Sequence, residues 1–210
     1  MKNTLAFSIL IFVVLISEAQ IFNSLEISTG LSMATQTPAY KNNDRNQRET
    51  IRPGFNTMLR MTGRINKIFS FSSDIGYVQK GYRYDVGNTI GITKTYDQLI
   101  HYITYSPQLK IGRRIGDFTP TVFLGPRIDY QIAYEGKQKI DGMARYFRKS
   151  IFGMNAGLDF AYAFGELGIS ALFLYQFDFT SLIPTNNNAD LAYRNKALLM
   201  NIGLVYFLGD

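Results

Sequence analysis

Few residues in this sequence have the types and the spacing that catalysis requires. His101 is the only histidine of the 210-residue chain, and the chain contains no cysteine. A Ser-His-Asp arrangement would need a serine and a carboxylate beside His101, and a metal site would need further ligands around it. The sequence has neither a nucleophile elbow nor a glycine-rich loop that could cradle a phosphate. We therefore expect no enzymatic activity, no cofactor and no metal ion.

A second group of residues is charged, and each member stands at a polar position in a stretch where polar and apolar residues alternate. The group consists of Arg60, Asp74, Arg127, Asp129 and Asp159. If these stretches close into a small barrel, the group forms either a substrate-binding interior or an internal network of ion pairs. We favour the network, because charges removed from water need partners. Roughly eight strands also leave room only for side chains or one small ligand.

A third group is basic and lies in the polar stretch EGKQKIDGMARYFRKS, residues 135–150. Its five cations exceed the two carboxylates Glu135 and Asp141 by three charges, and Tyr146 and Phe147 lie among them. The five cations are Lys137, Lys139, Arg145, Arg148 and Lys149. Such a loop is suited to the phosphate groups of lipopolysaccharide or to an acidic protein partner. A solvated loop without a partner is the alternative.

The elements that position these residues are strands with one apolar face. In VFLGPRIDYQIAY, residues 122–134, mainly apolar residues occupy the even positions, whereas Arg127 and Asp129 stand at odd positions. A period of two is typical of a β-strand with two unlike faces. We expect eight strands and no helix. The seven other alternating segments are residues 25–33, 55–62, 69–77, 98–111, 152–162, 167–179 and 196–208.

The connections between these segments alternate in length. Short turns are expected around residues 63–66, 112–117 and 165–167, and long polar loops at 35–50, 85–95, 134–149 and 180–194. Outer-membrane barrels have short periplasmic turns at one end and longer extracellular loops at the other. The sequence therefore predicts an all-β protein, an eight-stranded antiparallel up-and-down transmembrane β-barrel with this arrangement of turns and loops.

The apolar faces of such strands point either inward, as in a soluble lipocalin-like barrel, or outward to lipid. The polar faces here are rich in Gly, Ser, Asn and Thr, which fit the cramped interior of eight strands, whereas a solvated face more often carries Lys and Glu. Aromatic residues such as Tyr77, Tyr130, Tyr134 and Tyr162 gather toward strand ends, as they do in interfacial girdles. We predict that the apolar faces contact lipid, and that His101 lies on this face near the outer end of its strand.

Residues 1–19 have the features of a secretory signal peptide. Lys2 is a basic start, residues 5–16 are almost all apolar, and small residues stand where cleavage is determined. The apolar run is shorter than the roughly 20 residues that a membrane-spanning helix needs. We expect cleavage after Ala19 and a single barrel domain over residues 20–210. For an exported protein, the formal charge of +6 suits anionic lipid head groups better than nucleic acid.

Five stretches of the sequence resemble the PorT-like family of bacterial outer-membrane β-barrels, in the same order and over essentially the whole chain after the signal peptide. They are DIGYVQKGYRYD (74–85), YSPQLKIG (105–112), FLGPRIDYQIAY (123–134), FGMNAGLDFAY (152–162) and NIGLVYFLGD (201–210). The resemblance implies an eight-stranded barrel in the outer membrane. The founding member is linked to a protein-secretion apparatus, but members of the family differ in role.

Together these features predict a non-enzymatic outer-membrane barrel with a structural or interaction role, for example as a subunit of an envelope or secretion assembly. The expected partners are outer-membrane lipid, lipopolysaccharide and an envelope protein, and nucleic acid is not expected. A small-solute channel, a lipid-modifying enzyme and a soluble lipocalin-like carrier are the alternatives.

Overall fold

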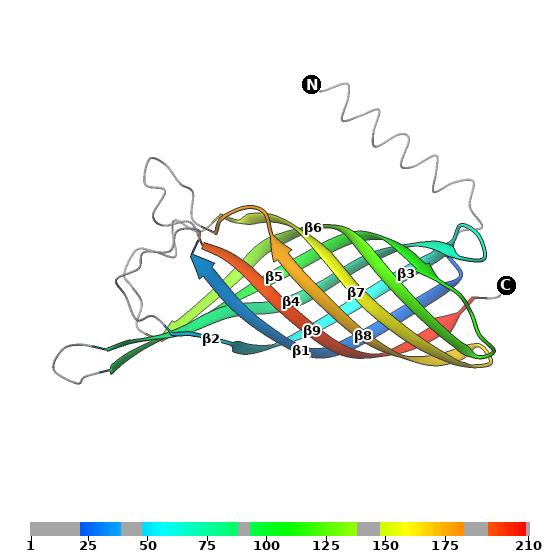
Figure 1. Cartoon of the computed structure of the whole chain (residues 1–210), viewed down its shortest axis with the longest axis horizontal. Coiled ribbons are helices and arrows are strands. Elements are labelled where there is room, and N and C mark those ends of the chain that lie inside the picture. Colours follow the sequence, from blue (N-terminus) through cyan, green and yellow to red (C-terminus); the bar gives the residue numbers. More distant parts are fainter. Residues whose placement is uncertain (1–21, 39–47, 88–92, 138–147, 183–192, 209–210) are drawn as a thin grey trace, which may run out of the picture.

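Eight long strands form one closed antiparallel sheet in the computed structural model of the chain (Figure 1). The structure describes residues 22–38, 48–87, 93–137, 148–182 and 193–208. The barrel strands are β1 (Ser24–Pro38), β3 (Arg52–Arg64), β4 (Phe69–Gly87), β5 (Thr93–Gly112), β6 (Phe118–Lys137), β7 (Ser150–Phe164), β8 (Leu167–Asp178) and β9 (Tyr193–Phe207). Each strand pairs with the next along the chain, and β1 pairs with β9, so the sheet has no open edge. A further short strand, β2 (Arg48–Thr50), pairs with β4.

The predicted eight-stranded antiparallel up-and-down transmembrane barrel is thus confirmed. No described helix has the length and apolar character needed to cross a membrane. The predicted signal peptide, residues 1–19, lies outside the described residues, so its cleavage stays a prediction.

Short turns lie together at one end of the barrel, beside the described ends of the chain (Figure 1). They join β3 to β4, β5 to β6 and β7 to β8 through residues 65–68, 113–117 and 165–166. Gly116 and Gly165 have φ angles of 62° and 75°, a backbone conformation that glycine adopts without the cost of a Cβ. We call this the turn end, and the opposite end, where the long connections lie, the loop end.

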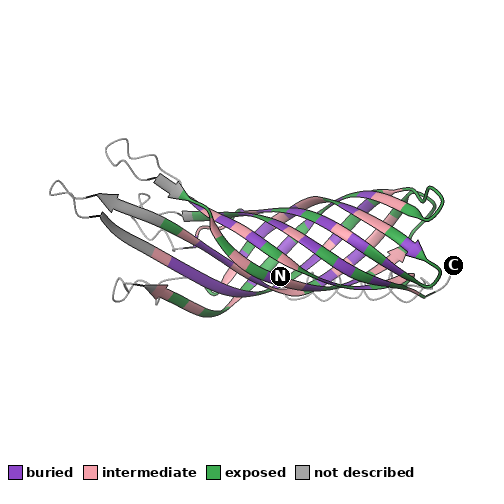
Figure 2. Ribbon diagram, turned by 90° about the horizontal axis from the view of Figure 1, so that it is seen from below, coloured by how far each residue is buried: buried purple, intermediate pink, exposed green. Residues whose placement is uncertain are grey.

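Side chains alternate between buried and exposed along most of each barrel strand (Figure 2). Large apolar residues point out of the barrel, with Ile202 74% exposed and Leu204 65% exposed. Charged residues point inward, and Arg60 and Arg127 are each only 2% exposed. A soluble carrier barrel would have the opposite polarity, so the lipocalin-like alternative is wrong.

The alternation of β6 is interrupted near the loop end. The pairing of β5 with β6 shifts between His101 and Tyr102, and Ile132 of β6 is skipped. Such a bulge adds one residue to one strand and reverses the direction of the side chains beyond it. The prediction that the alternation of residues 122–134 continues unbroken, with Tyr134 facing lipid, is therefore wrong. Tyr134 packs against residues of the barrel interior.

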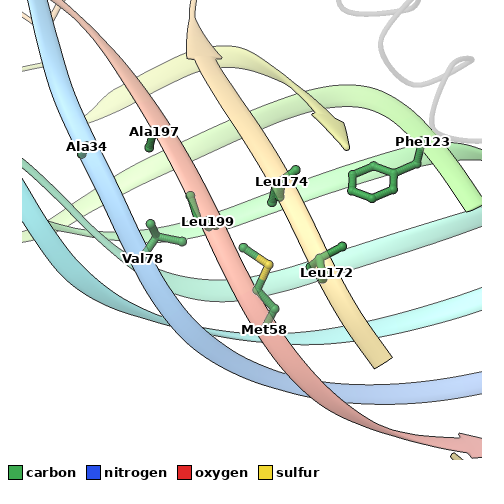
Figure 3. Packing of buried hydrophobic residues seen from close by; sticks show 8 residues of the cluster. All are labelled: Ala34, Met58, Val78, Phe123, Leu172, Leu174, Ala197 and Leu199. Atoms are coloured by element: carbon green, nitrogen blue, oxygen red, sulfur yellow. The ribbon is translucent and has the colours of Figure 1, made fainter. Parts of the chain in front are cut away.

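Apolar side chains fill much of the interior between the two ends (Figure 3). The exposed fraction of these residues is between 0 and 4%. We call them the apolar layer: Ala34, Met58, Val78, Phe123, Leu172, Leu174, Ala197 and Leu199. A second group, the apolar cap, lies nearer the loop end and consists of Ile100, Tyr102, Ile151 and Leu182.

Candidate functional site

The charged residues inside the barrel form two clusters, and none of these residues is more than 6% exposed. The turn-side cluster consists of Glu26, Arg60, Asp74, Lys110 and Asp159. The loop-side cluster consists of Lys80, Arg127, Asp129 and Asp178. The turn-side cluster draws its members from five strands and the loop-side cluster from three, so the closure of the barrel is what brings them together.

Arg60 is the centre of the turn-side cluster. Its Nε and Nη2 donate to the two carboxylate oxygens of Asp74 on the neighbouring strand, at 2.9 and 2.8 Å. Its Nη1 reaches across the barrel to Asp159 at 3.1 Å and lies 3.5 Å from a carboxylate oxygen of Glu26. Lys110 Nζ donates to the same Asp159 oxygen at 2.6 Å. Two cations therefore face three carboxylates.

The loop-side cluster has equal numbers of cations and carboxylates. Lys80 Nζ donates to Asp129 at 2.6 Å, and Arg127 Nε lies 3.0 Å from the same carboxylate oxygen. Arg127 Nη2 also donates to Asp178. The Lys80 ammonium lies 5.5 Å from the ring centre of Tyr102, a member of the apolar cap. This cluster is neutral when all four groups are ionised.

A chain of hydrogen bonds along one wall connects the two clusters. Gln108 Nε2 donates to Asp74 at 3.0 Å and to the hydroxyl of Ser106 at 3.4 Å. The Ser106 hydroxyl also accepts from Asn155 Nδ2 at 3.0 Å, and the Asn155 oxygen accepts from Arg127 at 3.1 Å. The wall from β5 to β7 therefore carries a continuous polar path beside the apolar layer.

The five interior charges named in the sequence prediction all lie inside the barrel, but in two groups. Arg60, Asp74 and Asp159 belong to the turn-side cluster, whereas Arg127 and Asp129 belong to the loop-side cluster. The sequence prediction omits the other four members. A consistent use of the alternation would have included them, because all stand on the inward phase of their strands: Glu26, Lys80, Lys110 and Asp178.

His101 lies on the outward phase of β5 but is only 8% exposed, so it is covered by its neighbours and not open to lipid. Its Nδ1 hydrogen-bonds with the hydroxyl of Tyr77, and its Nε2 lies 3.3 Å from a carboxylate oxygen of Glu135. In a Ser-His-Asp arrangement, the serine hydroxyl would lie at the imidazole nitrogen opposite the carboxylate. Here the hydroxyl of Tyr77, a phenol, occupies that position. Within the described ranges, no three His, Asp or Glu side chains are grouped to hold a metal ion.

Only part of the predicted interaction loop is described. Arg148 and Lys149 are exposed at the loop end, just before β7, and the backbone N–H of Arg148 donates to Leu182 at 2.7 Å. Lys137 is the last residue of β6. The Lys137 side chain and the whole of Lys139 and Arg145 lie outside the described residues.

A salt bridge of three groups holds the strands together at the loop end. β4 and β5 are 19 and 20 residues long, whereas about 9–11 residues cross a bilayer, so their outer parts extend beyond the lipid-facing band. Asp97 on β5 accepts from Arg52 Nε and from Arg83 Nη2, both at 2.7 Å. Partial burial alone would raise the pKa of Asp97, but the hydrogen bonds from Arg83 and Arg52 outweigh it and lower the pKa below its usual value.

Fold, side-chain polarity and filled interior together define the class of this protein, a small transmembrane β-barrel. No family model matches the sequence, and neither does any curated protein. The resemblance to the PorT-like family therefore stays a prediction.

Solved structures in which the chain follows a similar path include those of three bacterial proteins. OprG from Pseudomonas aeruginosa is 12% identical with a TM-score of 0.48, over 89% of this chain and 97% of that one. Neisserial surface protein A is 12% identical with a TM-score of 0.47, over 88% and 97%. Ail, the attachment invasion locus protein of Yersinia pestis, is 13% identical with a TM-score of 0.40, over 89% and 100%. The fold assignment itself comes from the strand pairing and burial described above.

Proposed function

We propose that this chain is a non-enzymatic protein of the outer membrane with a structural or interaction role in an envelope assembly. One observation carries the proposal: the barrel has an apolar outside and a charged inside. Apolar side chains on its strands, such as Ile27, Leu124 and Leu204, are half exposed or more. A closed sheet satisfies every strand hydrogen bond without water, which is what a span across lipid requires.

The distribution of turns and loops supports an orientation. Short turns face the periplasm in barrels of this type, so we place the loop end outside the cell. Arg148 and Lys149 are exposed there, and they belong to the basic stretch of residues 135–150. Their charge suits phosphate groups of lipopolysaccharide or an acidic surface on an envelope protein.

The filled interior argues against a role as a small-solute channel. Members of the apolar layer such as Phe123, Leu172 and Leu174 are at most 4% exposed. Charged clusters occupy the interior on both sides of this layer, with their groups paired to one another. Eight strands leave an interior that side chains can fill, and here they do so.

The membrane placement is tested by cell fractionation followed by gel electrophoresis with and without heating. We expect the protein in the outer-membrane fraction, with a migration that changes on heating, because a closed hydrogen-bonded barrel resists detergent at room temperature. The purified protein should give no steady conductance in planar bilayers. Recovery from the soluble periplasmic fraction would contradict the placement, and steady single-channel currents would favour the channel.

The interaction role is tested by replacing Lys137, Lys139, Arg145, Arg148 and Lys149 with serine. We expect intact barrel assembly but weaker association with lipopolysaccharide vesicles or with proteins that co-purify from native membranes. The association of the wild type should fall with added salt, since exposed charges are screened beyond about 8 Å at physiological ionic strength. A variant with Lys67→Ser and Arg113→Ser, at the turn end, is the control. Equal association of the five-residue variant and the wild type would refute a role of this loop.

A further inference from the structure

The turn end of the barrel contains a cavity of about 450 Å³. It lies among the turns from β3 to β4, from β5 to β6 and from β7 to β8. Its volume falls in the range of roughly 300–1,000 Å³ that is typical of small-ligand sites. We call this cavity the vestibule. Nothing in the proposed function uses it, because the proposed interactions are made at the opposite end.

The floor of the vestibule is closed. It is formed by Glu26, Lys110 and Asp159, members of the turn-side cluster. Lys110 and Asp159 are joined at 2.6 Å, and Arg60 holds Asp159 from the other side at 3.1 Å. The apolar layer occupies the interior beyond this cluster. The vestibule is therefore a pocket with one opening, and a molecule that enters it must leave by the same way.

The rim of the vestibule is basic. Arg64, Lys67, Arg113 and Arg114 line it from two turns that lie side by side, because Gly112 donates a backbone hydrogen bond to Ile68 at 2.9 Å. Of the described lining residues at this level, only Glu166 is acidic. Asp117, which is exposed and outside the lining, is 3.6 Å from Arg114. Lys67 and Arg113 are exposed and make no ion pair with a described residue.

The walls of the vestibule between rim and floor are partly apolar. Ile68 and Phe69 line it on one side, Ala161 and Ala163 on another, and Val205 and Phe207 on a third. Small side chains at 161 and 163 leave the space that the cavity occupies. A ligand that matches this surface has anionic groups at the level of the rim and a short carbon skeleton against the walls.

We propose that the vestibule binds a small organic anion that carries two or more carboxylate or phosphate groups. Guanidinium and ammonium groups from adjacent turns match such a ligand, because arginine forms paired hydrogen bonds with carboxylates and phosphates alike. The low-dielectric walls strengthen this attraction relative to open solvent. The inference is independent of the proposed function, since it concerns the other end of the molecule.

Calorimetric titration of the detergent-solubilised full-length barrel tests the proposal, with citrate, inorganic phosphate and glycerol as probes. We expect citrate to bind one site per barrel and glycerol not to bind. Replacing both Lys67 and Arg113 with serine should raise the dissociation constant for citrate at least about tenfold, the loss expected for one charge-assisted hydrogen bond. Arg194→Ser with Lys196→Ser, which removes two exposed cations of β9 outside the vestibule, is the matched control and should change it less than about twofold.

A variant that fills the cavity separates binding inside the vestibule from adsorption on its rim. Ala161→Phe keeps every cation but occupies the space, so it should abolish citrate binding. If Ala161→Phe does not give a heat-modifiable barrel, Ala163→Leu, nearer the opening, is used in its place. Citrate that binds the filled variant as tightly as the wild type would overturn the proposal, as would a wild type that binds no citrate. If phosphate binds more tightly than citrate, the ligand class is the one that carries phosphate groups. If phosphate binds more weakly than citrate, the ligand class is the one that carries carboxylate groups.

Discussion

The two charge clusters of the barrel interior differ in charge balance and in position relative to the vestibule. The turn-side cluster has three carboxylates for two cations and forms the floor of the vestibule. The loop-side cluster has two of each and lies between the apolar layer and the apolar cap. A buried ion pair is held by its partners alone, because no water replaces a lost partner. An unbalanced cluster beside a cavity has more freedom to rearrange.

This difference indicates that the two clusters have different roles in the barrel. The loop-side cluster fixes β4, β6 and β8 to one another, through charges on all three strands. The turn-side cluster fixes β1, β3, β4, β5 and β7, but it also presents polar groups to a cavity. We expect substitutions in the balanced cluster to affect stability most, and substitutions in the unbalanced cluster to be tolerated in part.

The largest effect is expected for Arg127→Leu in the loop-side cluster. This change removes the partner of Asp178 and one partner of Asp129, so two buried carboxylates share Lys80 alone. The free energy of unfolding should fall by roughly 3–5 kcal/mol, the cost of breaking a buried pair. Urea unfolding in lipid vesicles, followed by circular dichroism, measures it. Lys149→Leu on the exposed loop is the control and should stay within about 0.5 kcal/mol of the wild type.

A smaller and more selective effect is expected when one carboxylate in each cluster is neutralised. Asp129→Asn leaves Lys80 and Arg127 with a single carboxylate and should cost about 3 kcal/mol. Glu26→Gln leaves two cations facing two carboxylates, and its amide oxygen can still accept the hydrogen bond that Ser170 donates to Glu26 at 2.8 Å. We expect a loss of at most about 1 kcal/mol for this variant. Equal losses in the two variants would show that charge balance does not distinguish the clusters.

The smallest effect is expected outside the lipid-facing band, at Asp97. Because its carboxylate is within reach of water and Arg83 is 44% exposed, Asp97→Asn should cost only about 0.5–1 kcal/mol at pH 7. The pKa of Asp97 is lowered in the folded protein, so its contribution is present above the unfolded value of about 3.9 and is lost as the pH falls through the folded value. Unfolding of wild type and variant should therefore converge below about pH 4. A difference that persists in strong acid would contradict an ionic role.

Much of the fold was predictable from local sequence. The alternation of apolar and polar residues is a local property, because successive side chains of a strand point to opposite faces. It indicated the eight strands, and the small residues of the polar face indicated which side is inward. The lengths of the connections indicated which end carries the long loops. The same alternation placed Arg60 and Arg127 inside, where the structure has them.

Contacts across the barrel were decided only by the tertiary structure. Arg60 and Asp159 are 99 residues apart in sequence, and their meeting depends on the stagger of strands around the closed sheet, which no local pattern encodes. The division of the charges into two clusters follows from that stagger, as does the vestibule between the turns. The bulge at Ile132, which turns Tyr134 inward, is likewise a mismatch between two paired strands and not a property of either alone. Outside this bulge, sequence determined which way a side chain points, because that depends on its own strand, whereas closure of the barrel determined what it touches.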